Sequence, residues 1–210
     1  MALDEAMMLA ATEPWMRVYR WDQPSLSIGF SQPIDVVPAE YRAWPVVRRW
    51  TGGGVVVHDG DWTYTLAMPS EDALSQQRAA DAYRWVHEAM VLALAEAGFG
   101  GGELQPESTS DGMGVCFIEP AKFDVVWQGN KIAGAAQRRA KSGYLHQGTI
   151  QSMQLPENFD QGFATQMAEE VVVHDHRTTE AEFLAMAQKL VIKKYGTEDW
   201  LKHRTIAAQP

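Results

Sequence analysis

Three successive glycines, Gly52–Gly54, constrain this chain more than any other feature of its sequence. They stand between PVVRRW at 45–50 and GVVVHD at 54–59, which are typical of two β-strands or of one strand bent at the glycines. Glycine weakens a strand because it leaves a gap where a side chain would pack. The triplet therefore indicates a bulge, a tight bend, or a ligand that must come close to the backbone. The glycines alone favour a bulge and a ligand about equally.

Further strand-like segments lie on both sides of the triplet. A turn cluster, Asp22–Ser25, joins the first two of them. The pair Gly129–Asn130 predicts a hairpin between two later ones, and a second turn, Ala140–Gly143, follows. Besides the two segments around the triplet, the expected strands cover 15–21, 25–30, 63–69, 122–128, 131–139 and 143–153.

Helices are expected at the start, in the middle and near the end of the chain. Their expected bounds are 2–11, 81–97 and 179–195. The last helix has a capping pattern formed by Thr179 and Glu182, and it ends at Gly196. Strands and helices together predict an α+β fold, with a mixed, largely antiparallel β-sheet flanked by helices. We expect one domain over residues 1–210, on which the C-terminal helix packs.

Composition excludes several classes of protein. The chain has 210 residues and a formal net charge of −9, which argues against nucleic-acid binding because that requires a basic surface. No apolar run approaches the roughly 20 residues of a membrane span, and the start lacks the pattern of a secretory signal. Cys116 is the one cysteine, so an internal disulfide is excluded. We therefore expect a cytoplasmic protein without a membrane or nucleic-acid partner.

Two residues carry reactive groups where a site could form. Lys131 follows the predicted hairpin turn and precedes the small residues Ala133–Ala136. A lysine against apolar walls can act as a base or hold its charge against a developing oxyanion, although a solvated hairpin lysine gives the same pattern. Cys116 follows a glycine-rich loop, where a nearby ammonium would favour the nucleophilic thiolate. A lone cysteine is otherwise a small buried apolar residue.

The histidines give weaker indications. His58 and His146 lie on expected strands, where packed or hydrogen-bonded histidines are commoner than catalytic ones. His174 and His176 resemble a metal-binding pair, but no third and fourth ligands stand at suitable spacing. We predict no metal site.

Six segments, taken in chain order, resemble one protein family. They are MALDEA, SLSIGFSQ, RRWTGGGVVVHDGDWTYT, VCFIEPAKFDVVWQGNKIAGAAQRR, YLHQGTI and KKYGTEDW. Over nearly its whole length the chain is similar to the lipoate–protein ligases and octanoyltransferases, which are related to the biotin–protein ligases. The resemblance implies the fold of the class II synthetase core. It also implies transfer of an octanoyl or lipoyl group to a lysine of a small carrier domain.

The resemblance further implies roles for single residues. Lys131 matches the position of the family's active-site lysine, and Cys116 stands where the cysteine-dependent octanoyltransferases keep their nucleophile. Arg138, Arg139 and Lys141 would offer acidic carrier proteins a docking patch, or else form a solvated strand end. The implied substrate-binding residues, which line an acyl tunnel, are Arg49, Thr51, Gly52, Gly53, Gly54, His58, Gly134, Ala135, Ala136, His146 and Gly148.

Two branches of the family differ in chemistry. Cys116 and the DWTYT motif favour the transferase, which takes octanoate from acyl carrier protein through a cysteine thioester and needs no cofactor. Its acceptor would be a lipoyl domain or a glycine-cleavage H-type protein. The alternatives are a ligase, which uses ATP and Mg to form lipoyl-adenylate, and a non-catalytic acyl-binding relative. A biotin ligase is disfavoured, because the chain has no glycine- and arginine-rich adenylate loop of the biotin type.

The chain departs from the family's pattern in two places. We expect the strand that usually precedes the first helix to be missing or truncated, and the segment between Ile150 and the final helix to be shorter than usual. We expect these departures to affect the choice of carrier and the activity itself.

Overall fold

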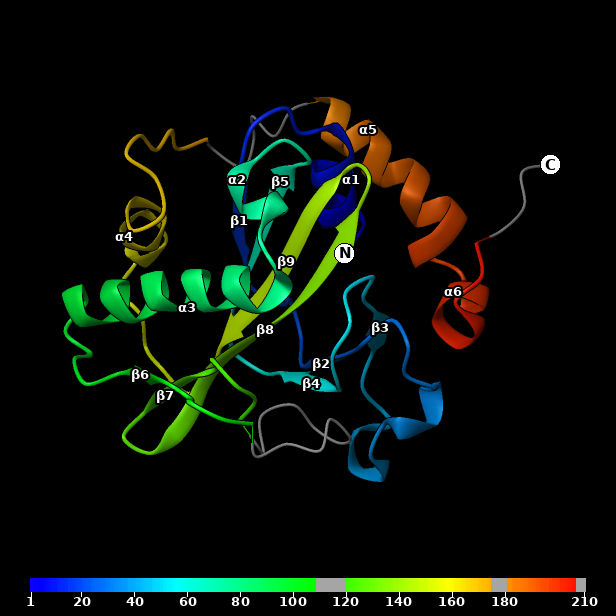
Figure 1. Cartoon of the computed structure of the whole chain (residues 1–210). Coiled ribbons are helices and arrows are strands. Elements are labelled where there is room, and N and C mark those ends of the chain that lie inside the picture. Colours follow the sequence, from blue (N-terminus) through cyan, green and yellow to red (C-terminus); the bar gives the residue numbers. More distant parts are fainter. Residues whose placement is uncertain (109–119, 175–180, 207–210) are drawn as a thin grey trace.

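The computed structural model describes residues 1–108, 120–174 and 181–206. Their strands form two β-sheets, around which the helices pack (Figure 1). All strand pairs of the larger sheet are antiparallel, and the smaller sheet has one parallel and one antiparallel pair. The prediction of an α+β fold with a mixed, largely antiparallel sheet is therefore confirmed.

The larger sheet has six strands in the order β1-β5-β9-β8-β7-β6. At its centre, β9 pairs along its whole length with both β5 and β8. The short β7 pairs with β8 only as far as Ala133, so beyond that residue one edge of β8 has no neighbouring strand among the described residues. The strands are β1 (Trp15–Tyr19), β5 (Trp62–Pro69), β6 (Glu103–Leu104), β7 (Val125–Trp127), β8 (Asn130–Ala140) and β9 (Gly143–Ile150).

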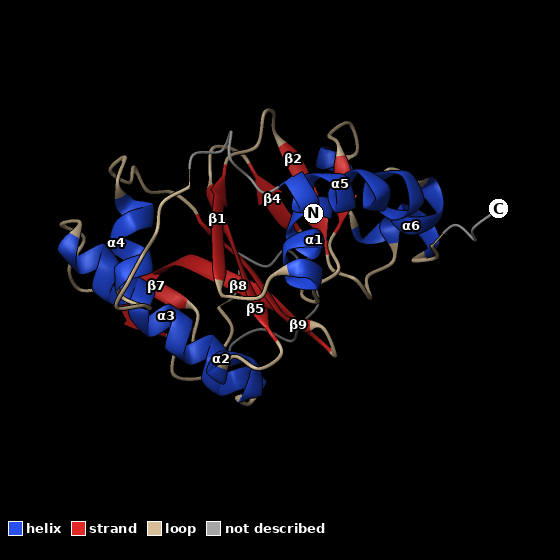
Figure 2. Ribbon diagram, turned by 90° about the horizontal axis from the view of Figure 1, so that it is seen from above, coloured by secondary structure: helices blue, strands red, loops and turns tan. Residues whose placement is uncertain are grey.

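Different helices cover the two faces of this sheet. Successive strand residues point to opposite faces. Helix α3 (Ala79–Glu96) packs on the face that carries Tyr64 and Tyr144, whereas α1 (Ala2–Ala10) packs on the opposite face over Ala67. Figure 2 shows these two helices on opposite sides of the strands. The α3 face therefore carries the larger core cluster.

The C-terminal helices extend the layer formed by α1. Helix α5 (Ala181–Leu190) packs on α1 and continues into a π-helical turn, η4 (Val191–Tyr195), which ends at Gly196 as predicted. The chain then forms α6 (Glu198–His203), which the sequence analysis did not predict. The remaining helices are the 3-10 turns η1 (Ile34–Val36) and η2 (Ala39–Tyr41), α2 (Ala73–Gln76) and α4 (Phe159–Thr165).

The smaller sheet explains what the glycine triplet connects. Strand β2 (Ser25–Ile28) lies between β3 (Val46–Arg48), to which it is parallel, and the antiparallel β4 (Val56–His58). The two segments around the triplet are therefore separate strands that do not pair with each other, and the glycines cross the end of β2. A Cβ on Gly29 would lie 1.9 Å from the carbonyl oxygen of Gly53, which shows how closely the two backbones approach.

Two turns differ in detail from the predictions. The turn at 22–25 leads from the larger sheet to the smaller one, because β1 pairs with β5 and β2 pairs with β3 and β4. The predicted hairpin joins β7 to β8, but its two turn residues are Gln128 and Gly129, one position earlier than expected. Both have positive φ, 50° and 76°, as a two-residue type I′ turn requires.

Candidate active site

Lys131 lies near the start of β8 and forms a buried ion pair. Its Nζ is 2.7 Å from Oδ2 of Asp124, and the two side chains are only 6% and 1% exposed. The same Oδ2 accepts the backbone N–H of Ala121 at 2.6 Å, and Oδ1 accepts the hydroxyl of Tyr83. The carboxylate of Asp124 thus fixes the position of the lysine amine at the edge of β8.

This ion pair has room because Gly134 carries no side chain. A Cβ at this position would lie 2.9 Å from Cε of Lys131, 3.2 Å from its Nζ and 3.0 Å from Oδ1 of Asp124. Any side chain here would push the amine or the carboxylate aside. The predicted residues Lys131 and Gly134 are therefore in contact.

The glycine triplet is held by Arg49, which is 5% exposed. One guanidinium nitrogen donates to the carbonyl oxygens of Gly52 and Gly54, at 3.0 and 2.8 Å, and another to the carbonyl of Ser27 at 2.9 Å. Gly53 has a φ of 83°, which side chains rarely adopt. Arg49 thus shapes the loop from within the protein.

The triplet lies against β8. A Cβ on Gly53 would be 3.5 Å from the Cβ of Ala136, whereas one on Gly52 would meet no atom within 4 Å. Because alternate strand residues share a face, Ala136 and Gly134 both lie on the face that the triplet approaches. Thr51 is anchored to the same face, since its hydroxyl donates to Gln147 of β9 at 2.8 Å.

His58 belongs to a buried network beside this loop. Its Nε2 is 2.7 Å from Oγ of Ser27, its Nδ1 is 2.8 Å from Oδ2 of Asp61, and its ring stacks on Trp21 at 4.0 Å. Burial lowers the pKa of His58 below its ordinary value. The ring is therefore neutral, with Nδ1–H donating to Asp61 and Nε2 accepting from Ser27.

His146 and Gly148 lie on the other face of the sheet, beneath α3. The two ring nitrogens of His146 are 3.0 Å from the hydroxyl of Tyr64 and 2.9 Å from that of Tyr144. A Cβ on Gly148 would come within 2.5 Å of the ring of Tyr64. Burial lowers the pKa of His146 well below its ordinary value, so the ring is neutral. Neither residue shares the face that the glycine triplet approaches.

Cys116, the predicted nucleophile, lies outside the described residues, as do Thr179 and His176. The structure consequently gives no distance between Cys116 and Lys131.

Three residues around the ion pair were not predicted, namely Asp124, Tyr83 and His87. Asp124 could have been predicted from the sequence. The hairpin pairs Val126 with Lys131, so the residues just before Val126 lie close to the lysine. Tyr83 is 41 residues from Asp124 in the chain. The sequence places Tyr83 on the apolar side of a helix but gives no sign of its partner.

The suggested docking patch is only partly exposed. Arg139 donates to the carbonyl of Leu74 and lies over the ring of Tyr144. Arg138 lies over the rings of Phe30 and Trp50, at 5.1 and 4.8 Å. Both side chains thus pack against the protein, and Lys141 is the exposed member of the three.

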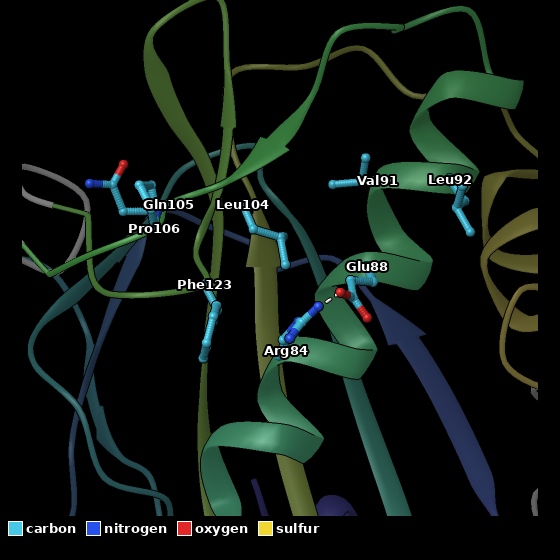
Figure 3. Close-up of a pocket in the computed structure, with 8 residues that line it drawn as sticks. All are labelled: Arg84, Glu88, Val91, Leu92, Leu104, Gln105, Pro106 and Phe123. Atoms are coloured by element: carbon cyan, nitrogen blue, oxygen red, sulfur yellow. Dashed lines mark hydrogen bonds and ion pairs between the residues drawn. The ribbon is translucent and has the colours of Figure 1, made fainter.

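A separate hollow of about 580 Å³ lies between α3 and the segment around β6 (Figure 3). Arg84 and Glu88 form an ion pair of 2.7 Å at its wall, and both side chains are exposed to solvent. Its other lining residues are Val91, Leu92, Leu104, Gln105, Pro106 and Phe123. Since none of these is a predicted site residue or a nucleophile, we assign this hollow no chemistry.

Among the described residues, no helix is both long and apolar enough to cross a membrane. Nor do His, Cys, Asp or Glu side chains in that part of the chain gather in a group of three that could hold a metal ion.

Comparison with known proteins identifies the family. Residues 1–187 match the model described as "Lipoyl protein ligase A/B catalytic domain". The chain is 32% identical to the octanoyltransferase LipM of Kyrpidia tusciae, over 71% of this chain and 60% of that protein. It spans about three fifths of the length of the curated relatives that it matches.

Solved structures show the same fold. A lipoate-protein ligase A bound with ATP has a TM-score of 0.74 and 24% identity, covering 95% of this chain and 91% of that one. A structure described as "a bi-partite lipoate protein ligase and its E2 lipoyl domain from Thermoplasma acidophilum" has a TM-score of 0.67 and 23% identity, covering 100% of this chain and 92% of that one. The resemblance noted in the sequence is thus confirmed, and this chain belongs to the family of lipoyl protein ligase A/B catalytic domains.

Proposed function

We propose that this protein is an acyltransferase, which moves an octanoyl group from acyl carrier protein to a lysine of a lipoyl carrier domain through a thioester on Cys116. The observation that carries the proposal is the buried pair of Lys131 and Asp124, at 2.7 Å, beside a face lined by glycine and alanine. Relatives named octanoyltransferase support the same reaction.

The reaction has two steps. In the first, the Cys116 thiolate attacks the thioester carbonyl, a new C–S bond forms, and the donor's thiolate leaves. In the second, the amine of the carrier lysine attacks the Cys116 thioester, a C–N bond replaces the C–S bond, and the Cys116 sulfur leaves. The Lys131 ammonium gives a proton to the departing sulfur and takes the proton of the amine in exchange. Both steps pass through a tetrahedral oxyanion. The Lys131 ammonium and backbone N–H groups stabilise its charge.

The acyl chain would run along the glycine triplet at Gly52, beside the face of β8 that carries Gly134 and Ala136. Gly52 has no neighbour within 4 Å of a Cβ placed on it, so an apolar chain could lie there. Arg49 and His58 contribute indirectly, because their polar atoms bind the loop and the strands around it. His146 and Gly148 support the sheet from the opposite face.

The partners follow from this reaction. Acyl carrier protein is the donor, and a lipoyl domain or an H-type protein is the acceptor; a solved structure of the same fold is described as part of a lipoylation system with a lipoate protein ligase and its E2 lipoyl domain. The transferase needs no cofactor. We place the reaction in the cytoplasm, where the thiol of Cys116 stays reduced, and assign residues 1–210 to one catalytic domain.

The main rival is an ATP-dependent ligase, since a ligase of the same fold binds ATP. A transfer assay with octanoyl-acyl carrier protein and a lipoyl domain separates the two. We expect transfer without ATP or Mg, and its loss in Cys116→Ser and in Lys131→Ala. Undiminished, ATP-dependent lipoylation by Cys116→Ser would establish the ligase instead. A degenerate, non-catalytic relative would show neither activity.

A further inference from the structure

The hydroxyl of Tyr83 joins two parts of the candidate site. It accepts the backbone N–H of Ala135 at 2.9 Å and donates to Oδ1 of Asp124. Burial, and then the charge of Asp124, raise the pKa of Tyr83 well above its ordinary value. The phenol therefore keeps its proton and remains a donor to the carboxylate.

The bond to Ala135 fills a gap in the sheet. Strand β7 stops pairing with β8 at Ala133, so the N–H of Ala135 points to an edge where no described strand follows. A buried N–H without a partner is costly, and Tyr83 supplies that partner from α3. One hydroxyl thus links the helix, the strand and the carboxylate that holds Lys131.

One turn further along α3, His87 holds the residue that precedes Asp124. Its Nδ1 is 2.6 Å from the carbonyl oxygen of Phe123 and donates to it, and its ring lies 4.3 Å from that of Tyr83. Phe123 has a φ of 69°, which is unusual for a residue other than glycine. Residues four apart on a helix share a face, so Tyr83 and His87 brace the same turn.

We propose that Tyr83 is a positioning residue: its hydroxyl orients the carboxylate of Asp124, which in turn holds the amine of Lys131 where acyl transfer requires it. This inference rests on the proposed function. Tyr83 itself need not touch the acyl group. Its effect should appear in the rate of transfer rather than in substrate binding, because small displacements of a reacting group lower the rate strongly.

The test compares Tyr83→Phe with the wild-type chain in ATP-free octanoyl transfer. The variant keeps the ring and loses only the hydroxyl. We expect kcat to fall about tenfold, since the lost bond involves a charged group, while KM for the acyl donor stays within about twofold.

Tyr195→Phe is the matched control. The hydroxyl of Tyr195, like that of Tyr83, donates to a carboxylate that is paired with a buried lysine. Here the carboxylate belongs to Glu5 and the lysine is Lys194. This second triad joins α1 to η4 and shares no residue with the ion pair of Lys131 and Asp124. We expect the control to lower thermal stability as much as Tyr83→Phe does and to leave kcat unchanged.

A double-mutant cycle shows whether Tyr83 acts through Asp124. If it does, Tyr83→Phe adds nothing once Asp124→Asn is present, whereas independent effects would multiply. An unchanged kcat in Tyr83→Phe, or multiplying effects, would overturn the inference. If Tyr83→Phe fails to fold, Asp124→Asn is measured instead, and an unchanged kcat in that variant would also overturn the inference. If the wild-type chain transfers no octanoate, the proposed function fails as well.

Discussion

Gly134 determines, at the scale of single residues, how closely Lys131 can lie to its own strand. A methyl group at Gly134 would stand 2.9 Å from Cε of Lys131, at the flexible end of that side chain. We expect Gly134→Ala to fold normally, because a flexible side chain can move away. Its kcat/KM should fall about tenfold or more, because the amine is displaced. Steady-state transfer kinetics, with a thermal melt beside them, check both parts; unchanged kinetics would contradict the assignment.

His87 makes the stability of the fold depend on pH. Burial lowers its pKa from 6.5 to about 4. Between these two pH values the unfolded chain binds a proton at His87 and the folded chain does not. The contribution of the neutral ring to the free energy of unfolding is therefore fully present above pH 6.5. As the pH falls from 6.5 to about 4, this group alone should remove about 3 kcal/mol from the free energy of unfolding.

Urea unfolding between pH 7 and pH 4 measures this effect. His87→Gln should flatten the pH dependence, although the buried His146 titrates in the same direction and remains in the variant. Parallel curves for the two proteins would show that His87 contributes nothing to the pH dependence.

Single residues also show what sequence can reveal. The contact of Lys131 with Gly134 lies within one hairpin, where local spacing and turn type determine the neighbours. Tyr83, by contrast, reaches Asp124 across 41 positions of the chain. Only the packing of α3 on the sheet creates that contact, so no local pattern predicts it.

At the scale of elements, the glycine triplet offers a test of the acyl path. A methyl group on Gly52 would meet no protein atom within 4 Å. Gly52→Ala should therefore leave the melting temperature unchanged within about 1 °C while it shortens the space available to the acyl chain. We expect a preference for hexanoyl over octanoyl donors, by about threefold or more in kcat/KM. An unchanged chain-length profile would place the acyl chain elsewhere.

Arg48 ties the C-terminal helix α6 to β3, the strand that precedes the glycine triplet. This buried guanidinium donates to the carbonyls of Trp200 and Leu201 in α6, and to those of Gly29 and Phe30 after β2. Arg48→Met would leave these carbonyls without their donor. We expect a loss of about 3 kcal/mol or more in the free energy of unfolding.

Arg84→Met is the control for that measurement. Arg84 forms an exposed pair with Glu88 within α3, and such pairs contribute about 0–1 kcal/mol. Equal urea midpoints for the two variants would mean that the bonds of Arg48 do not anchor α6.

Elements differed in how far the sequence determined them. The helix α3 has a regular apolar pattern and the strand β9 follows a recognisable turn, and both were predicted within a few residues. The separation of β1 and β2 into different sheets was not predicted, because a turn cluster looks the same whether it closes a hairpin or leads to another sheet. The helix α6 depends on its contact with Arg48, which lies far from it in the chain.

At the scale of the whole molecule, the candidate site lies where the two sheets meet. The glycine triplet follows β3 of the smaller sheet and approaches β8 of the larger one near Ala136. The family resemblance predicted site residues on both sides of this contact, in the glycine triplet and in β8. It did not separate the residues on this face from His146 and Gly148 on the other, because the register between β8 and β9 decides which of their residues share a face.

Intact-mass spectrometry tests the central claim most directly. The chain is incubated with octanoyl-acyl carrier protein in the absence of ATP, and the mass of the protein is measured before a carrier domain is added. We predict a single octanoyl adduct that peptide mapping assigns to Cys116, that is absent in Cys116→Ser, and that disappears when the carrier domain is supplied. Octanoyl transfer to the carrier without any adduct on Cys116 would contradict the account.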